Sequence, residues 1–172
     1  MNIFYLASDP IKCARQHCDK HVIKMILETA QMLSTAHRLM DGKMVRGKWR
    51  HPDQVMDAYL YRMTHTNHPS AIWIRESREN YKWAYQLLVA LNDEYMRRYG
   101  REEPHRTMRI AHMLRKPPKS MKRGGRFTAP PQCVPDDCKR RSVIKAYRDY
   151  YREYKAHFAT WKNTPTPKWF LS

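Results

Sequence analysis

The chain has 172 residues, of which 42% are hydrophobic and 12% aromatic. This composition excludes a disordered chain, and the length favours one domain, 1–172, with a core of its own. Lysine and arginine number 33 against 16 acidic residues, so the net charge is +17. Such an excess predicts a polyanionic partner, nucleic acid above all; the alternative is a chain that is basic for solubility or for assembly.

The N-terminal stretch MNIFYLASDP lacks the basic start and the long apolar run of a signal peptide. No later stretch approaches the 18 or so apolar residues of a membrane span. We therefore expect a soluble, cytoplasmic protein with no membrane partner, in which the cysteines are reduced thiols. The sequence does not indicate an oligomeric state.

The hydrophobic periodicity predicts a mostly α-helical fold with little sheet. The stretch NIFYL is expected to be a short strand or an extended arm, and Ser8, Gly42 and Gly100 are expected to bound the two longest helices. Between Gly42 and Arg50 a basic loop is expected. Helices are predicted over about 9–40, 53–63, 70–99, 105–115 and 139–160.

Prolines and glycines interrupt the chain from 104 to 141 and predict a long, basic, irregular region. Within it, KPPKSMKRGGRF at 116–127 combines glycines, which allow close backbone approach, with cations that suit phosphate. A mobile solvated loop is the alternative. The cations expected to contact nucleic acid are Lys119, Lys122, Arg123 and Arg126. The tail TPTPKWFLS is predicted to be extended.

The first long helix carries a file of polar residues on an otherwise apolar surface. If this face of the helix is exposed, the Lys24–Glu28 pair is an ordinary surface ion pair. If the helix is packed on most sides, the polar residues must line a cleft, because burying unpaired charges is too costly. In a cleft of so basic a protein, a lone carboxylate such as Glu28 would repel phosphate and is better suited to chemistry on a sugar or base. The file comprises His17, His21, Lys24, Glu28, Gln31 and Thr35.

Aromatic and basic residues alternate in AYRDYYREYKAHFATWK, at 146–162. Tyr150 and Tyr151 are candidates for stacking on bases, beside cations that contact phosphates; packing on the core is the alternative, and we expect both uses. In NHPSAIW, His68 either caps the turn or lies at the mouth of the cleft as a ligand of phosphate or base.

Metal binding by the cysteines is a further alternative. Cys13 and Cys18 form one pair of thiols, and Cys133 and Cys138 form another. A four-residue gap is loose for zinc, and two cysteines five apart on one helix diverge by about 140°. The preferred interpretation is therefore small core residues, with no metal and no cofactor.

The stretch DKHVIKMILETAQML, from Asp19 to Leu33, and the stretch NHPSAIW, from Asn67 to Trp73, resemble the pyrimidine-dimer DNA glycosylase family of the phage endonuclease V type. The resemblance covers about residues 1–100, with a looser likeness in the last helix. It implies a compact helical enzyme acting on double-stranded DNA, in a bacterium or a phage-infected cell. It also implies that an amine at the start of the chain attacks C1′ of a damaged nucleotide, releases the base and cleaves the strand by β-elimination.

By register Glu28 is the glutamate that serves this chemistry. The amine is that of Met1, that of Asn2 if Met1 is removed, or that of Lys24. The family has arginines where this chain has Leu27 and Gln31.

DNA contacts on the first long helix are therefore expected from Lys20, His21, Lys24 and Gln31. A non-catalytic nucleic-acid-binding phage protein on the same scaffold is the alternative function.

Overall fold

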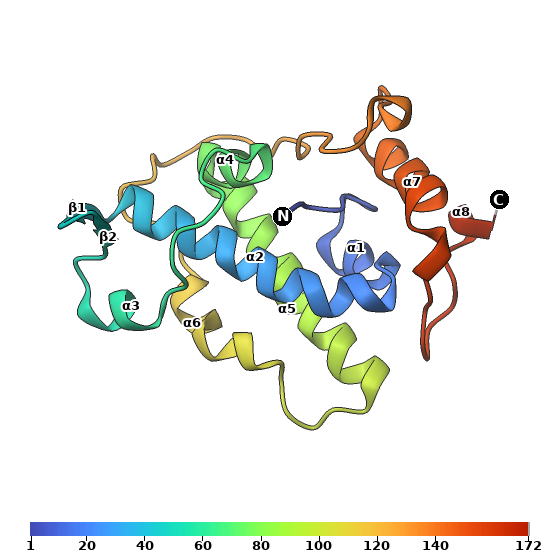
Figure 1. Ribbon diagram of the computed structural model, residues 1–172, viewed down its shortest axis with the longest axis horizontal. Coiled ribbons are helices and arrows are strands. Elements are labelled where there is room, and N and C mark those ends of the chain that lie inside the picture. The colour runs from blue at the N-terminus through green and yellow to red at the C-terminus, as the bar shows by residue number, and fades with distance from the viewer. Residues whose placement is uncertain (172) are drawn as a thin grey trace.

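The structure is a computed structural model that describes residues 1–171, and it is mostly helical, as predicted (Figure 1). Its α-helices are α1 (Pro10–Gln16), α2 (Asp19–Met40), α3 (Gln54–Tyr59), α4 (Pro69–Glu76), α5 (Arg78–Tyr99), α6 (Ala111–Leu114), α7 (Val143–Tyr154) and α8 (Lys168–Leu171). Short 3-10 helices are η1 (Arg106–Ile110), η2 (Asp136–Cys138) and η3 (Ala156–Phe158), and strands β1 (Lys43–Val45) and β2 (Lys48–Arg50) form a hairpin.

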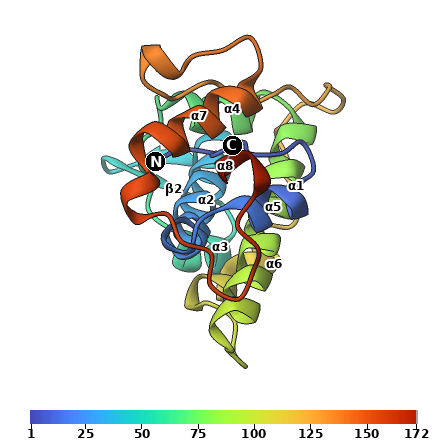
Figure 2. The same ribbon diagram turned by 90° about the vertical axis from the view of Figure 1, so that its right-hand side faces the viewer.

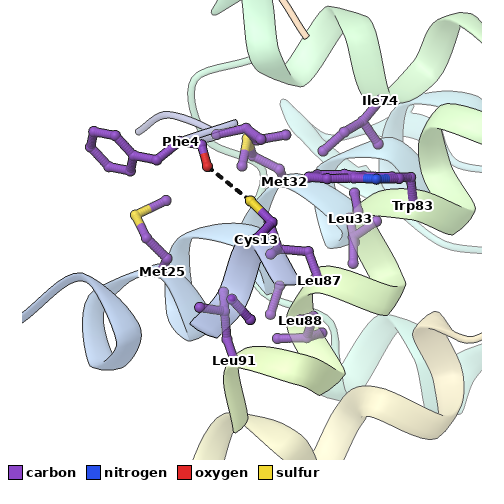
Figure 3. Close-up of a cluster of buried hydrophobic side chains, with 14 of the residues drawn as sticks. Phe4, Cys13, Met25, Met32, Leu33, Ile74, Trp83, Leu87, Leu88 and Leu91 are labelled. Carbon is purple, nitrogen blue, oxygen red and sulfur yellow. Dashed lines mark hydrogen bonds between the residues drawn. The ribbon is translucent and has the colours of Figure 1, made fainter. Parts of the chain in front are cut away.

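The core lies where α2 and α5 pack against each other, with α1 and α4 beside them (Figure 1). Leucines of α5 meet methionines of α2 there, while the N-terminal arm and α1 close one side, as Figure 3 shows. The thiol of Cys13 is fully buried in this cluster and donates a hydrogen bond to the carbonyl of Phe4 (3.2 Å). Cys13 is therefore a core residue, and its thiol provides a hydrogen-bond donor for a carbonyl of the N-terminal arm.

The helix predicted over 9–40 is interrupted, because His17 and Cys18 have extended backbones between α1 and α2. The buried guanidinium of Arg98 holds this break open from α5. It donates to the carbonyls of Arg15 (2.9 Å) and His17 (2.8 Å) and to the carboxylate of Asp19 (2.9 Å). Backbone acceptors that a continuous helix would have used internally are therefore satisfied by a side chain 81 and 83 residues away.

The helix predicted over 70–99 is also divided, at Ser77, whose φ of −148° and ψ of 155° are extended. The Ser77 hydroxyl accepts from the backbone N–H of Asn80 (3.1 Å) and so caps the start of α5. The predicted end is confirmed, because Gly100 has the left-handed φ of 58°.

The stretch predicted as a basic loop is a β-hairpin, in which Val45 pairs with Lys48. Its two loop residues, Arg46 and Gly47, both have positive φ (49° and 75°). That combination matches the right-handed twist of the flanking strands. The helix expected over 53–63 is shorter, since α3 ends at Tyr59.

The region 104–141 contains η1, α6 and η2, and otherwise has no regular structure along its described length. It runs back across α4 and α5, where Thr128 donates its N–H to the side chain of Asn80 (2.9 Å). The last long helix, α7, is shorter than predicted, and α8 interrupts the tail that was expected to be extended. Figure 1 shows α7 and α8 together at one end of the molecule, and in Figure 2, which is seen from that end, both lie toward the viewer. No described helix is long and apolar enough to cross a membrane.

Candidate active site

The N-terminal arm is buried and extended, without a strand among its described residues. Ile3 and Leu6 are inaccessible to solvent. The side chain of Asn2 fixes the start of the arm: its amide donates to the carbonyl of Cys133 (2.9 Å), and its oxygen accepts from the hydroxyl of Tyr147 (2.9 Å). The arm is thus held in place, and so is the backbone nitrogen that precedes it.

That nitrogen lies beside the glutamate that the sequence indicated. The amine of Met1 is 3.5 Å from Oε2 of Glu28, and the side chains of the two residues are 2% and 14% exposed. Figure 1 shows the N-terminus against the middle of α2, the helix that carries Glu28. A fixed amine and a largely buried carboxylate therefore meet at one point on the surface.

A second amine approaches the same carboxylate. Nζ of Lys24 is 3.5 Å from Oε1 of Glu28, one helical turn away, and the lysine side chain is 63% exposed. Each carboxylate oxygen of Glu28 thus has its own cationic neighbour, the backbone amine of Met1 on one side and the exposed side chain of Lys24 on the other. The predicted catalytic candidates Met1, Lys24 and Glu28 are brought together, while the side chain of Asn2 is used as an anchor.

His68 lies at the edge of this group, at the start of α4. Its Nδ1 accepts a hydrogen bond from the backbone N–H of Ser70 (3.2 Å), so the ring caps the start of α4. This is the first of the two roles that the sequence suggested for His68. Burial is the main cause that lowers the pKa of His68, and the charges of the N-terminal amine and His65 add to it, opposed by Glu28. The charges of the N-terminal amine and of Glu28 therefore both act on His68.

The expectation that His21 and Tyr151 contact nucleic acid needs correction, because both are buried. Nδ1 of His21 is 2.6 Å from the hydroxyl of Tyr151, and the His21 ring stacks on Phe4 with centroids 4.2 Å apart. Burial, followed by nearby positive charges, lowers the pKa of His21 to about 3, so the ring is neutral. The arm and α7 cover this part of α2, and neither ring is accessible to a phosphate.

The polar file therefore does not line one continuous cleft. Its first member, His17, lies in the break before α2 and is inaccessible to solvent, as is its last member, Thr35, whereas Lys24 is exposed and Gln31 is half-buried. The ammonium of Lys20 is exposed and lies 4.7 Å from the centre of the Phe158 ring. Only the middle of the file, around Glu28, faces the N-terminal amine.

Tyr150 and the cations of 116–127, which were also predicted to contact DNA, lie at the surface. Tyr150 is half-buried, with Nζ of Lys155 4.6 Å from its ring centre, and the basic residues of 116–127 are exposed. This segment is anchored near the end of α2, where the backbone N–H of Lys119 donates to Asp41 (2.8 Å). Asp41 lies 13 positions after Glu28, which is about 20 Å along a helix. The Lys119 end of the segment is therefore distant from the amine and its carboxylate, whereas the other end reaches the N-terminal arm, where the ring centres of Phe127 and Tyr5 are 6.3 Å apart.

Two groups were missed by sequence reasoning. Tyr147, counted among the aromatic residues of the last helix, is fully buried and positions the arm through Asn2.

His37, Asp41 and His51 form the one group of three metal-ligand side chains found among residues 1–171, and it contains no cysteine. All four cysteines are free. The contacts of Tyr147 with Asn2 and of His51 with Asp41 join different segments of the chain, and such contacts produce no periodic pattern in the sequence.

Comparisons with known proteins give no independent assignment of this site. No protein-family model, no curated protein and no solved structure matches the chain.

Proposed function

We propose that this protein is a DNA glycosylase with AP-lyase activity on damaged or modified pyrimidines, and that the α-amine of Met1 is its nucleophile. The observation that carries the proposal is the 3.5 Å contact between this amine and Glu28. The resemblance of Asp19–Leu33 and Asn67–Trp73 to the pyrimidine-dimer glycosylases supports the same reaction.

The reaction needs an amine that can attack carbon and a carboxylate that can handle the proton and the charge. The amine forms a bond to C1′ while the bond from C1′ to the base breaks, and the base leaves with the electron pair. The C1′–O4′ bond then breaks, O4′ takes a proton, and the opened sugar is joined to the amine nitrogen as an iminium. Positive charge thus develops on the sugar and then on this nitrogen, and Glu28 is the candidate to stabilise it, to accept the proton that the amine loses and to pass a proton to O4′.

Strand cleavage follows from the imine. Removal of a proton from C2′ pushes electrons toward the imine nitrogen, and the bond between C3′ and its phosphate oxygen breaks by β-elimination. Glu28 is the carboxylate closest to the amine among the ion pairs of the described residues, so it is the candidate for this second proton transfer as well. One carboxylate thus serves both steps.

Met1 is a better nucleophile candidate than Lys24 for two physical reasons. An α-amine is intrinsically a weaker base than the ε-amine of a lysine. The arm also restricts the position of the α-amine, whereas the Lys24 side chain is 63% exposed and pays the entropy of ordering when it reacts. Lys24 is better placed to contact a phosphate next to the target sugar.

DNA binding in this proposal rests on charge. The net charge of +17 favours binding to a polyanion, and the exposed cations of 116–127 form a basic irregular segment suited to backbone phosphates. The chain lacks the family's arginines at Leu27 and Gln31, so phosphate contacts are assigned to Lys20, Lys24 and this segment.

Borohydride trapping tests the chemistry. The protein is incubated with duplex DNA carrying an abasic site or a thymine dimer, reduced with borohydride, and the adduct is digested and mapped by mass spectrometry. We expect a covalent adduct on the peptide that begins with Met1. Glu28→Gln should lower the trapping rate at least 100-fold, in the range of general acid–base effects. Glu79→Gln, an exposed glutamate paired with Lys82, is the matched control and should leave the rate unchanged.

Three results separate the alternatives. An adduct on Lys24, lost in Lys24→Gln, would move the nucleophile to that residue. An adduct on Asn2, with Met1 absent by intact mass, would show that processing exposes the next amine. No adduct on either substrate, together with salt-sensitive DNA binding, would refute the enzyme and leave a non-catalytic nucleic-acid-binding protein.

A further inference from the structure

A second group of titratable side chains lies at the far end of α2, about 20 Å along the helix from Glu28. Oδ2 of Asp41 is 3.9 Å from Nδ1 of His37 and 3.9 Å from Nε2 of His51. The three ligand atoms lie within 4.8 Å of one another. The side chains are 4%, 9% and 5% exposed for His37, Asp41 and His51, so the group is largely shielded from water.

The two histidine nitrogens that face Asp41 are buried and have no hydrogen-bond partner. For His37 the proton can be assigned: the hydroxyl of Tyr81 donates to the carbonyl of Leu114 (2.9 Å), so its oxygen accepts from Nε2–H of His37 (2.9 Å). Nδ1 of neutral His37 therefore presents a lone pair to a carboxylate. Two electron-rich atoms facing each other in a buried site are repulsive unless a cation lies between them.

We propose that Nδ1 of His37, Oδ2 of Asp41 and Nε2 of His51 bind a divalent transition metal ion of the zinc class. Two imidazoles and one carboxylate, with a water in the fourth position, are a donor set that zinc accepts. Bonds of about 2.0–2.1 Å at a tetrahedral angle separate ligand atoms by roughly 3.4 Å. The two separations of 3.9 Å to Asp41 thus need a contraction of about half an ångström, and the separation between the two histidine nitrogens, which is within 4.8 Å, needs at most about 1.4 Å.

The surroundings suit a cation. The group is at the C-terminal end of α2, where the helix dipole favours positive charge. Tyr81 fixes the His37 ring from behind, and the backbone N–H groups of Lys119 and Ser120 fix the carboxylate of Asp41 (2.8 Å each). Such second contacts orient ligands in metal sites.

His51 has to change its tautomer on loading. The backbone N–H of Asp53 donates to Nδ1 of His51 (3.1 Å), so the proton of the neutral ring is on Nε2, facing Asp41. Metal binding at Nε2 moves this proton to Nδ1, breaks the hydrogen bond from Asp53 and leaves the number of protons unchanged. The amide of Asp53 is therefore a direct reporter of binding.

The bound ion would join three segments that are distant in the sequence. His37 and Asp41 belong to the end of α2, His51 follows the hairpin, and Asp41 also holds the backbone of the basic segment 116–127. The site would thus stabilise the position of a surface assigned to DNA, whether or not the amine reaction occurs. Its failure and that of the glycosylase proposal are separable, because metal binding is measured without DNA.

Calorimetric titration of the full chain, first freed of metal with a chelator, tests the site with Zn²⁺ alone. We expect one ion per chain, with at least 100-fold weaker binding in His37→Gln and in Asp41→Asn. His112→Gln, an exposed histidine outside the group, is the matched control and should bind like the parent chain. No binding by the parent chain, or equal binding by both site variants, would overturn the proposal.

Cobalt provides a test that does not depend on the variants folding. Co²⁺ bound to the parent chain should show the visible spectrum of four-coordinate nitrogen and oxygen ligation, and should broaden the amide signal of Asp53 and the ring signals of His37 and His51. An intense sulfur-to-cobalt charge-transfer band, or broadening centred on the cysteines, would place the metal elsewhere and refute this site.

Discussion

The stability of the protein should fall as the pH is lowered from 7 to 4, and His17 should be one identifiable cause. His17 is inaccessible to solvent, its Nδ1–H donates to the carbonyl of Cys13 (2.8 Å), and its Nε2 has no partner. Burial, opposed by that hydrogen bond and assisted by the charge of Arg98, lowers the pKa of His17 to about 4. Below pH 6.5 the unfolded chain therefore binds a proton that the folded chain does not.

The sign and size follow from proton linkage. The stabilisation is fully present above the unfolded pKa of 6.5 and is lost as the pH falls to about 4. Each pKa unit is worth about 1.36 kcal/mol, so His17 alone accounts for roughly 3 kcal/mol over this range. His21 and His37, whose pKa values are lowered to about 3 and about 4, add to the slope in the same range.

Urea unfolding at a series of pH values measures this slope. In His17→Asn, whose amide can still donate to Cys13, the slope of the unfolding free energy between pH 6.5 and 4 should fall by about 1.4 kcal/mol per pH unit. His112→Asn, at an exposed histidine, is the control and should keep the parent slope. A parent slope retained in His17→Asn would show that His17 is not buried as a neutral ring, and the reasoning would fail.

Two further predictions concern the packing of the chain. Arg98→Met should lower the unfolding free energy by about 3 to 5 kcal/mol in urea titrations, because it leaves Asp19 buried without its cation and the carbonyls of Arg15 and His17 without their donor; a loss below 1 kcal/mol would contradict this. Gly125→Ala should release the basic segment and speed tryptic cleavage within it, because φ is +91° and a Cβ would lie 2.9 Å from Cβ of Ser77. Gly100→Ala, with φ of +58° and open space, is the control for backbone strain alone, and equal cleavage in both variants would refute the docking contact.

The sequence by itself determined the helical elements and several of their ends. Periodic apolar residues indicated α2 and α5, and Gly100 ends α5 as its left-handed conformation requires. These features are local, because a helix and its caps depend on residues within about one turn of each other. For the same reason Glu28 could be singled out, as a carboxylate on an apolar helix in a strongly basic chain.

Only the tertiary structure determined the break between α1 and α2, which polar residues are buried, and which residues meet at the candidate site. The break before α2 is maintained by Arg98, 81 residues from the His17 carbonyl that it binds. Burial of His21 and Tyr151 follows from packing between segments 130 residues apart, so the same residues that looked suited to DNA are core residues. The approach of the Met1 amine to Glu28 depends on the buried arm and on the anchor at Tyr147. Such contacts form only when the core brings distant segments together. They are stabilised by burial and by pairing between these segments, so they produce no periodic pattern in the sequence.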